Sequence, residues 1–423
     1  MLQISFIREN TQEVIDRLAI RNIDAKNIIE QILDADNQRK EHQKNADEVL
    51  SEINAISKEV GALYQSGKQA EANSLKSKTV ELKEKSKVFS EKQIEAEKKV
   101  QELLITLPNT PHISVPRGKT PDDNKVFLEE GSLPILDEKA LCHWDLATKY
   151  DIIDFELGNK LTGAGFPVYK GQGARLQRAL INFFLDNAVA AGYLEIQPPL
   201  MVNEASGYGT GQLPDKEGQM YHVGIDNLYL IPTAEVPVTN IYRDVIVKID
   251  DLPIKNTAYS NCFRREAGSY GKDVRGLNRL HQFDKVEIVQ IVQPENSYQT
   301  LDEMRDYVAT LVRKLELPFR ILKLCGGDMG FTSSTTFDFE VYSGAQKKWL
   351  EVSSVSNFES FQANRMKLRV KDKEGKIRLA HTLNGSALAL PRIVAALLEN
   401  NQTPDGIIIP KELAKYTGFD IIS

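Results

Sequence analysis

The run Cys262-Phe263-Arg264-Arg265-Glu266-Ala267-Gly268-Ser269-Tyr270-Gly271 lies within the stretch that decides the fold, residues 257–289. Apolar residues alternate on both sides of this run, and the segment between them is polar and rich in glycine, which predicts an antiparallel strand pair with a long connection. A strand that ends in Arg-Arg-Glu places a cation and a carboxylate at the rim of a sheet. The arginine side chain is suited to binding phosphate, and the carboxylate could accept a hydrogen bond from an amine. Phe283 on the return strand could stack on a base. Taken alone, Arg-x-Glu is explained equally well by a surface hairpin with a solvated ion pair.

The longer run FRREAGSYGKDVRGLNRLHQFDKVE, residues 263–287, resembles motif 2 of the class II aminoacyl-tRNA synthetases. Over its whole length it is similar to the version found in the seryl-tRNA synthetase family. The resemblance implies that Arg264 contacts the α-phosphate of ATP and takes part in serine binding. It also implies that Glu266 binds the adenine amino group, that Phe283 covers the adenine face, and that Arg265 belongs to the ATP site.

The composition predicts a soluble protein of the reducing cytoplasm. The chain has 423 residues, enough for two or more domains, with 41% hydrophobic and 26% charged residues. No apolar run is long enough to span a membrane, and the first residues show no signal peptide. The 3 cysteines are scattered, so we expect no zinc. A net charge of -6 argues mildly against nucleic-acid binding but does not exclude a local basic patch.

Residues 1–106 are predicted to form a helical arm. Apolar residues recur at alternating steps of three and four in two series, separated near residues 65–68, which predicts an antiparallel coiled-coil hairpin. Each helix would have roughly 35 residues and a length of about 50 Å. Four polar seam positions would set the register: Arg39, His42, Ser86 and Gln93. The lysines of the second helix indicate either a solvated face or a stripe for a phosphate backbone. The resemblance implies that this arm grips the long variable arm of tRNA(Ser), and a tRNA(Sec) is left open as a second partner.

The Pro-rich residues 107–121 are predicted to be a linker, and residues 122–423 a class II catalytic domain. A helix from Gly173 followed by a short strand ending in Pro198-Pro199 resembles motif 1 of the class II enzymes, which implies a homodimer interface. An ordinary helix–strand unit explains these residues equally well. The glycine-rich residues 207–211 match no dinucleotide motif, and we expect a mobile loop over the site.

Three segments are assigned to serine by the resemblance. A short apolar strand over 228–231 ends in Thr233-Ala234-Glu235, which the family places at the amino acid. Glu287 lies on the return strand of motif 2 and is implied to be a serine ligand. A buried carboxylate that accepts the substrate hydroxyl would reject alanine strongly, because the unpaired group would be left unsatisfied. Asn384 and Ser386 match the Asn-Gly-Ser run that completes the pocket in the family.

Two further segments are assigned to the ATP phosphates. Glu351-Val352-Ser353-Ser354 ends a predicted strand, and Glu351 and Ser354 offer the hard oxygens that suit Mg²⁺ carried by ATP. The family uses this run for ATP and these two residues for the metal. Arg392 opens a predicted apolar helix, where the helix dipole also favours anions. This segment resembles motif 3, which implies that Arg392 holds the γ-phosphate, although Pro391 replaces the glycine that many family members have.

The fold class expected is α+β, with an antiparallel sheet flanked by helices and an N-terminal coiled-coil hairpin. The resemblance implies activation of L-serine by ATP to seryl-adenylate and transfer of serine to tRNA. The catalytic residues implied are Arg264 and Arg392, because adenylation needs reactants held in line and phosphate charge neutralised, and no protein nucleophile. Three alternatives are a class II synthetase for another amino acid, a truncated paralogue that loads a carrier protein, and a coiled-coil adaptor without activity. The arm, together with the Thr-Ala-Glu and Asn-Gly-Ser runs, argues against the first. The second would lack the arm and would bind zinc through cysteine, and the adaptor leaves some 300 residues without a role.

Overall fold

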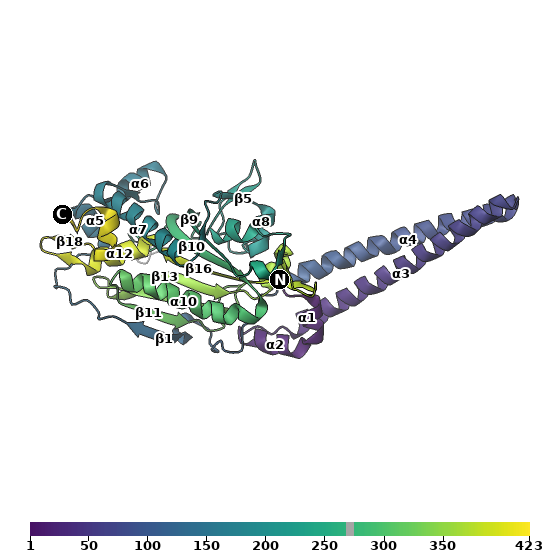
Figure 1. Cartoon of the computed structure of the whole chain (residues 1–423), viewed down its shortest axis with the longest axis horizontal. Helices are drawn as coiled ribbons and strands as arrows, with labels where there is room; N and C mark the ends of the chain where they lie inside the picture. Colours follow the sequence, from purple (N-terminus) through teal and green to yellow (C-terminus); the bar gives the residue numbers. More distant parts are fainter. Residues whose placement is uncertain (268–274) are drawn as a thin grey trace. The chain divides into compact units, whose positions relative to one another are not determined.

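The structure, a computed structural model, describes residues 1–267 and 275–423. Residues 268–274, which belong to the long connection predicted between the two strands, lie outside the described residues. The chain divides into two compact units, which are coloured by sequence in Figure 1. Unit 1 comprises Met1–Ala19 and Ile23–Pro108, and unit 2 comprises Ile20–Asn22 and Asn109–Ser423.

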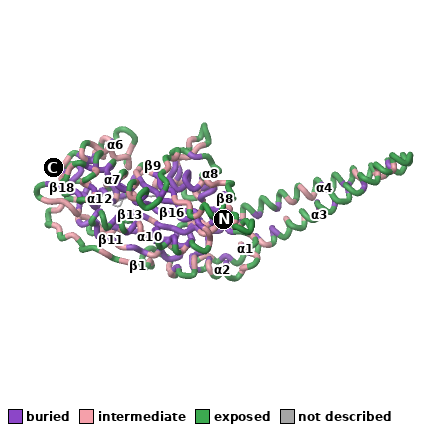
Figure 2. Tube along the Cα trace, viewed as in Figure 1, coloured by how far each residue is buried: buried purple, intermediate pink, exposed green. Residues whose placement is uncertain are grey.

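Unit 1 is built from helices and contains the predicted hairpin. Two long helices run antiparallel, and the three residues 66–68 between them include Gly67 in the left-handed region at φ 77. Buried residues recur along the facing sides of the pair, and the remaining sides are exposed (Figure 2). The first long helix has 40 residues, so it is about 60 Å long rather than the 50 Å expected. The four helices are α1 (Ile4–Glu9), α2 (Thr11–Ala19), α3 (Lys26–Gln65) and α4 (Gln69–Leu104).

A buried carboxylate stabilises the base of the hairpin. The side chain of Asp36 is fully buried, and it pairs with Arg8 at 2.6 Å, Arg39 at 2.9 Å and Lys40 at 3.2 Å. Burial alone would raise the pKa of Asp36, but the hydrogen bonds from these three cations lower it below its ordinary value. Arg39 was expected in the seam as a polar layer, and the structure shows that its partner is this aspartate.

Unit 2 is organised on an eight-stranded sheet with the order β1-β11-β12-β13-β16-β10-β9-β4. All neighbours pair antiparallel except β4, which pairs parallel to β9 at the edge. The predicted strand pair is β9 and β10, with Phe283 opposite Cys262. The strands are β1 (Lys125–Glu130), β4 (Leu194–Glu195), β9 (Ile254–Phe263), β10 (Gln282–Val292), β11 (Phe319–Lys323), β12 (Thr335–Ser343), β13 (Lys348–Asn357) and β16 (His381–Ala389).

The two faces of this sheet have opposite character. Val286 and Ile288 of β10, and Phe337 and Phe339 of β12, belong to the main apolar core, which also contains α7 (Gly171–Ala190), α10 (Ser297–Lys314) and α12 (Leu390–Asn400). Because side chains alternate along a strand, the residues between them lie on the other face. Those intervening residues are polar on the central strands: Lys285, Glu287, Ser354, Ser356, Asp338, Glu340, Asn384 and Ser386. On β10, β12, β13 and β16, one face of the sheet packs against α7, α10 and α12, and the other face is polar. The predicted site lies on this polar face.

Smaller elements surround the main sheet. Two three-stranded sheets have the orders β5-β7-β6 and β15-β14-β8, a third has the order β17-β18-β19, and β2 pairs with β3. Their bounds are β2 (Ile153–Asp154), β3 (Val168–Tyr169), β5 (Met201–Asn203), β6 (His222–Val223), β7 (Leu228–Leu230), β8 (Ile246–Lys248), β14 (Arg369–Lys371), β15 (Ile377–Leu379), β17 (Gln402–Thr403), β18 (Gly406–Ile408) and β19 (Ile421–Ile422). The short helices are α5 (His143–Lys149), α6 (Phe155–Leu161), α8 (Glu204–Thr210), α9 (Glu235–Asn240), α11 (Phe361–Met366) and α13 (Lys411–Thr417).

The prediction of a mobile loop over residues 207–211 was wrong. These residues belong to α8 and its end, where Asn203 caps the first turn and Gly211 ends the helix at φ 93. The glycines serve close packing instead, since a Cβ on Gly207 would lie 2.8 Å from Leu213 and one on Gly209 would lie 2.7 Å from Asn240. Glycine in a helix is read from sequence as a breaker, and only the tertiary contacts show the need for a small residue.

Residues 109–124 pack within unit 2. The backbone N–H of Asn109 donates to the carbonyl of Phe331 at 2.9 Å, and Asn109 is 2% exposed. Its own carbonyl accepts from Arg21, whose guanidinium also donates to the carbonyls of Met329, Gly330 and Ser333. Burial lowers the pKa of Arg21 to about 10. Among the described residues, no helix combines the length and the apolar character that crossing a bilayer requires.

Candidate active site

Arg264 and Phe283 lie together at one end of the polar face. Arg264 follows the last residue of β9, and its backbone N–H donates to the carbonyl of His281 at 3.0 Å. Its guanidinium carbon lies 5.3 Å from the centre of the Phe283 ring. The strand pair therefore holds a cation beside an aromatic ring at the rim of the sheet, as the sequence predicted. A planar group that stacked on the ring would lie next to a phosphate-binding fork.

Arg265 and Glu266 continue the chain away from β9. The backbone N–H of Arg265 donates to the carbonyl of Gln219 at 2.8 Å. Glu266 adopts a positive φ of 48, which is uncommon for a side chain of this size, and its carboxylate pairs with Arg279 at 2.7 Å. Glu266 is partly buried and Arg279 is exposed, so this ion pair lies at the surface and remains compatible with the surface-hairpin alternative.

Arg392 joins three segments at the start of α12. Its Nε donates to the carbonyl of Asn278 at 2.9 Å, and one Nη donates to the carbonyl of Glu351 at 2.7 Å. The same Nη lies 3.9 Å from the Glu351 carboxylate. Pro391 occupies the first turn, where its missing N–H costs nothing, so the departure from glycine leaves the helix start intact. The second predicted cation is therefore fixed next to the predicted metal ligand.

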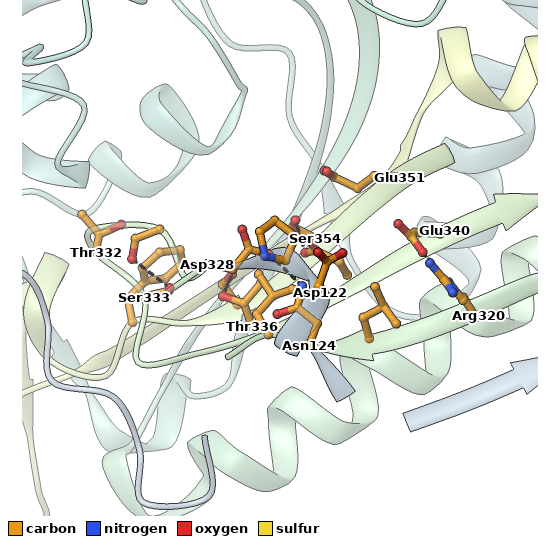
Figure 3. A pocket seen from close by; sticks show the side chains of 17 residues that line it. Asp122, Asn124, Arg320, Asp328, Thr332, Ser333, Thr336, Glu340, Glu351 and Ser354 are labelled. Carbon is orange, nitrogen blue, oxygen red and sulfur yellow. Dashed lines mark hydrogen bonds and ion pairs between the residues drawn. The ribbon is translucent and has the colours of Figure 1, made fainter. Parts of the chain in front are cut away.

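Glu351 and Ser354 line a cavity of about 580 Å³ over β12 and β13 (Figure 3). Ser354 lies opposite Asp338 in the strand register, and its hydroxyl donates to the Asp338 carboxylate. Burial raises the pKa of Asp338 well above its ordinary value, and the nearby charge of Glu351 raises it further. Asp328 and Asp122 extend the same lining. Glu351 and Ser354 offer two hard oxygens of the kind that Mg²⁺ prefers, and among the described residues no group of three or more His, Cys, Asp or Glu side chains could hold a metal ion by itself.

The structure does not bring the side chains of Val352 and Ser353 to this cavity. Val352 is 1% exposed and packs into the apolar core on the opposite face of the sheet. Ser353 is 2% exposed, and its hydroxyl donates to the carbonyl of Ser386 at 2.6 Å. Both residues were predicted to bind ATP. Their side chains serve the core and the sheet, which leaves only main-chain atoms for such a contact.

Thr233, Lys285 and Glu287 form a buried cluster on the polar face. Lys285 pairs with the Glu287 carboxylate at 2.6 Å, and the two side chains are 7% and 3% exposed. The Thr233 hydroxyl donates to the same carboxylate at 3.0 Å and accepts from the Lys285 ammonium at 2.8 Å. Two of these residues were predicted from the sequence, and Lys285 was missed. Its position on the same strand face as Glu287 was the only sequence signal for it.

Glu235 extends this cluster from the start of α9. Its backbone N–H donates to the Thr233 hydroxyl at 3.2 Å, and its carboxylate accepts from Gln362 at 2.7 Å. Burial raises the pKa of Glu235 to about 7, the charge of Glu287 raises it as well, and the hydrogen bonds from Gln362 and Asn384 oppose the shift. Lys285 supplies one cation to the two buried carboxylates and also lowers the pKa of Glu235. An ammonium ligand would balance the second negative charge.

The remaining predicted residues adjoin the cluster. Asn384 and Ser386 lie on β16, opposite Val289 and Glu287 of β10, and both are almost fully buried. Ala234 is fully buried in a small core with Ala258. Gln362 of α11 was missed by the sequence analysis, since its role depends on contacts with Glu235 and Thr382 that are distant in the chain. The site thus has an end with exposed or half-buried arginines, Arg264 and Arg392, and a buried cluster that contains Glu235, Lys285 and Glu287.

Both units match family models of aminoacyl-tRNA synthetases. Residues 1–111 match the family model of the seryl-tRNA synthetase N-terminal domain, and residues 221–401 match that of the tRNA synthetase class II core domain (G, H, P, S and T). The chain is 51% identical over 421 residues to the serine–tRNA ligase of Salinibacter ruber, which covers 99% of this chain and 98% of that protein.

Solved structures agree with these matches. The seryl-tRNA synthetase from Pyrococcus horikoshii, complexed with ATP, superposes with a TM-score of 0.93 at 33% identity and covers 100% of this chain and 99% of its own. The cytoplasmic serine-tRNA ligase from Naegleria fowleri, in complex with AMP, gives a TM-score of 0.88 at 25% identity, with 100% and 99% coverage.

Proposed function

This chain belongs to the seryl-tRNA synthetase family, and from that premise we propose how its residues divide the work of a serine–tRNA ligase. The enzyme activates L-serine with ATP and transfers the serine to tRNA(Ser). The observation that supports the division best is the single polar sheet face, which carries Arg264 and Phe283 at one end and the Thr233–Glu287 cluster beside them. One substrate can lie at each end, with the reacting groups between them.

ATP is assigned to the rim of the sheet. The adenine stacks on Phe283, and Glu266 accepts a hydrogen bond from its amino group beside the Arg279 pair. Arg264, held against Phe283, reaches the α-phosphate. Arg392 takes the γ-phosphate at the start of α12, and Arg265 adds a further cation to the ATP site. These contacts are stronger in the transition state, where negative charge on the phosphates is redistributed.

Magnesium is assigned to Glu351 and Ser354. When bound there, the metal would neutralise phosphate charge and orient pyrophosphate for departure. Arg392 contacts Glu351 through its carbonyl, so this chain fixes the cation of motif 3 and the metal ligand relative to each other. Asp338 supports Ser354 through its hydrogen bond.

Serine is assigned to the buried cluster. Its ammonium group binds Glu235 and Thr233, and its hydroxyl donates to Glu287, whose carboxylate Lys285 keeps oriented. Asn384 and Ser386 close the pocket, Ala234 contributes its backbone, and Arg264 binds the substrate carboxylate.

The reaction begins when that carboxylate attacks the α-phosphorus of ATP and pyrophosphate leaves. In the second step a terminal ribose hydroxyl of tRNA attacks the acyl carbon and AMP leaves. The chain supplies orientation and charge, and no covalent intermediate with the protein is needed.

The raised pKa of Glu235 makes serine binding depend on pH. Below pH 7 the carboxyl group is mostly neutral and binds an ammonium ion weakly, and above pH 7 it is ionised. We expect the apparent serine affinity to rise about tenfold between pH 6 and pH 8, because one group with this pKa changes its ionised fraction by that factor. The measurement is the serine KM in pyrophosphate exchange across this range.

Glu235→Gln is the control for this titration. The variant should bind serine weakly at every pH and lose the tenfold dependence, because its side chain does not titrate. A pH dependence that persisted in Glu235→Gln would assign the titration to another group, including the amine of the substrate.

The arm and the sheet edge are assigned to macromolecular contacts. Eight lysines of α4 are exposed and form the proposed stripe for the tRNA backbone: Lys76, Lys78, Lys83, Lys85, Lys87, Lys92, Lys98 and Lys99. The edge strand β4, with Leu194 65% exposed, and the adjoining Leu200 and Met201 form the proposed homodimer contact. A tRNA(Sec) is a second candidate substrate for the arm, and the cytoplasm is the proposed location.

The test of the proposed function is serine-dependent ATP–pyrophosphate exchange without tRNA, run beside threonine, alanine and glycine. Exchange with serine alone is expected, followed by charging of tRNA(Ser) when it is added. Exchange with another amino acid would mean that the buried cluster binds that amino acid and that the serine assignments are wrong. A folded protein that binds ATP and gives no exchange would overturn the proposed division of roles.

A further inference from the structure

A buried histidine–glutamate pair lies outside the site described above. His143, the first residue of α5, and Glu399 of α12 are both 0% exposed, and the Nδ1 of the histidine lies 2.7 Å from the Glu399 carboxylate. The same carboxylate accepts from the backbone N–H of His143 at 3.0 Å and from the Ser343 hydroxyl. Burial by itself would raise the pKa of Glu399, but these hydrogen bonds lower it below its ordinary value. Glu399 is therefore an ionised, fully engaged acceptor.

The hydrogen bonds define the tautomer of His143. Because Glu399 accepts at Nδ1, that nitrogen carries the proton. The other nitrogen, Nε2, accepts from the backbone N–H of Leu277 at 2.9 Å. A neutral ring with this tautomer is the form that satisfies both contacts, since a protonated Nε2 could not accept. The imidazole ring thus connects the carboxylate of Glu399 to the backbone N–H of Leu277 through one hydrogen bond at each nitrogen.

Leu277 belongs to the return segment of motif 2, residues 275–280, which leads into β10. The carbonyl of the next residue, Asn278, accepts from Nε of Arg392 at 2.9 Å. Gly276 has φ 66, and a Cβ there would lie 2.3 Å from Nε2 of His143, so backbone and ring are in close contact. Leu277 is thus hydrogen-bonded to His143, and the next residue, Asn278, is hydrogen-bonded to Arg392, which is assigned to ATP.

A second contact from α5 reaches the same segment. The guanidinium carbon of Arg275 lies 4.5 Å from the centre of the Trp144 ring, which is within the range of a cation–π interaction. Arg275 also lies 3.9 Å from the Asp145 carboxylate. The first three residues of α5 therefore all contact residues 275–277. Nothing in the proposed reaction uses α5, so these contacts need a different explanation.

We propose that His143, oriented by Glu399, is a positioning residue that fixes the return segment of motif 2 and, through Asn278, the Arg392 side chain for ATP binding. The proposal rests on the assignment of Arg392 to ATP. The proposal predicts an effect on ATP and not on serine, because Thr233, Lys285 and Glu287 contact one another and none of their described hydrogen bonds involves α5.

Two substitutions distinguish the two nitrogens. The amide of His143→Gln reaches the place of Nε2 and can accept from Leu277, whereas the amide of His143→Asn reaches only the place of Nδ1 and can donate to Glu399. We expect His143→Asn to lower kcat/KM for ATP in pyrophosphate exchange at least tenfold, and His143→Gln to stay within threefold of the wild type. The serine KM should change less than twofold in both variants.

Trp144 gives a readout that does not depend on turnover. In a Trp349→Phe background it is the only tryptophan, since the chain has 2. We expect ATP to change its fluorescence in the wild-type and His143→Gln backgrounds, and to change it little in His143→Asn. Gly276→Ala, which adds a methyl group where the ring lies, should reproduce the loss specific to ATP and serves as a second variant if His143→Asn fails to fold.

Thermal unfolding of each variant shows whether it is folded. A folded His143→Asn with wild-type kinetics for ATP would overturn the proposal, and so would equal losses in the Gln and Asn variants or a parallel rise in the serine KM. The absence of exchange in the wild-type protein would instead count against the proposed function. In that case the fluorescence response to ATP would still test the contact between α5 and motif 2.

Discussion

Replacement of Arg264 by alanine is expected to reduce serine-dependent pyrophosphate exchange about 10³-fold. The side chain is held over Phe283 at 5.3 Å and is assigned to the α-phosphate and to the serine carboxylate, the two groups that react. Removal of one preorganised donor from a developing charge costs about 10²–10³ in kcat. Arg264→Lys should recover only part of this loss, since an ammonium group lacks the planar fork and stacks poorly on the ring.

Arg313→Ala is the matched control. Arg313 is a half-exposed arginine of α10 that pairs with Glu130 at 2.8 Å, on an element that carries none of the assigned residues. A surface ion pair contributes about 0–1 kcal/mol, so this variant should keep its exchange rate and nearly all of its stability. A folded Arg264→Ala variant with exchange within tenfold of the wild type would remove Arg264 from the reacting centre.

Replacement of Glu287 by glutamine is expected to abolish most of the preference for serine over alanine. A site that hydrogen-bonds a substrate hydroxyl discriminates against the analogue without it by about 10⁴–10⁵. Glu287 supplies that acceptor, and its carboxylate is oriented by Lys285 at 2.6 Å and Thr233 at 3.0 Å. We expect the ratio of kcat/KM for serine and alanine to fall at least 10²-fold, measured by pyrophosphate exchange with each amino acid.

Loss of stability has to be separated from loss of recognition in this variant. Glu287→Gln leaves the buried ammonium of Lys285 without its carboxylate, which costs about 3–5 kcal/mol. The double variant Glu287→Gln/Lys285→Met removes both charges, so its Tm should return towards that of the wild type while the serine preference stays lost. Retention of the preference in the folded double variant would mean that the hydroxyl is read elsewhere.

The architecture of this protein was largely predictable from local sequence patterns. The steps of three and four over residues 26–104 require a helical hairpin, and α3 and α4 form one. The alternation around Arg264 predicts paired strands, and β9 and β10 pair antiparallel. Both predictions succeed because helix and strand periodicities are set by the backbone and need no knowledge of distant contacts. Helices α1 and α2 were not distinguished as separate elements within the predicted helical arm, and α8 was taken for a loop because its glycines suggested a break.

Matches to family motifs, rather than periodicity, identified the candidate site residues from the sequence. Phe283 and Glu287 lie on β10 and share one face by strand alternation, whereas Arg264 follows β9 and Thr233 and Glu235 lie at the start of α9. Contacts with Phe283 and Glu287, which no local pattern encodes, bring these three residues to the site. Val352 and Ser353 were predicted to bind ATP as part of the Glu351–Ser354 run that resembles the family, and the structure buries their side chains.

The sequence by itself thus determined the coiled-coil arm, the central strand pair, the family and the residue types of the site. Only the tertiary structure decided that Lys285 pairs with Glu287, that Gln362 binds Glu235, and that His143 joins Glu399 to Leu277. The physical reason is that burial and charge proximity are properties of elements brought together from distant parts of the chain. The pKa of Glu235 near 7 is set by such contacts with β10 and α11, which no local pattern encodes.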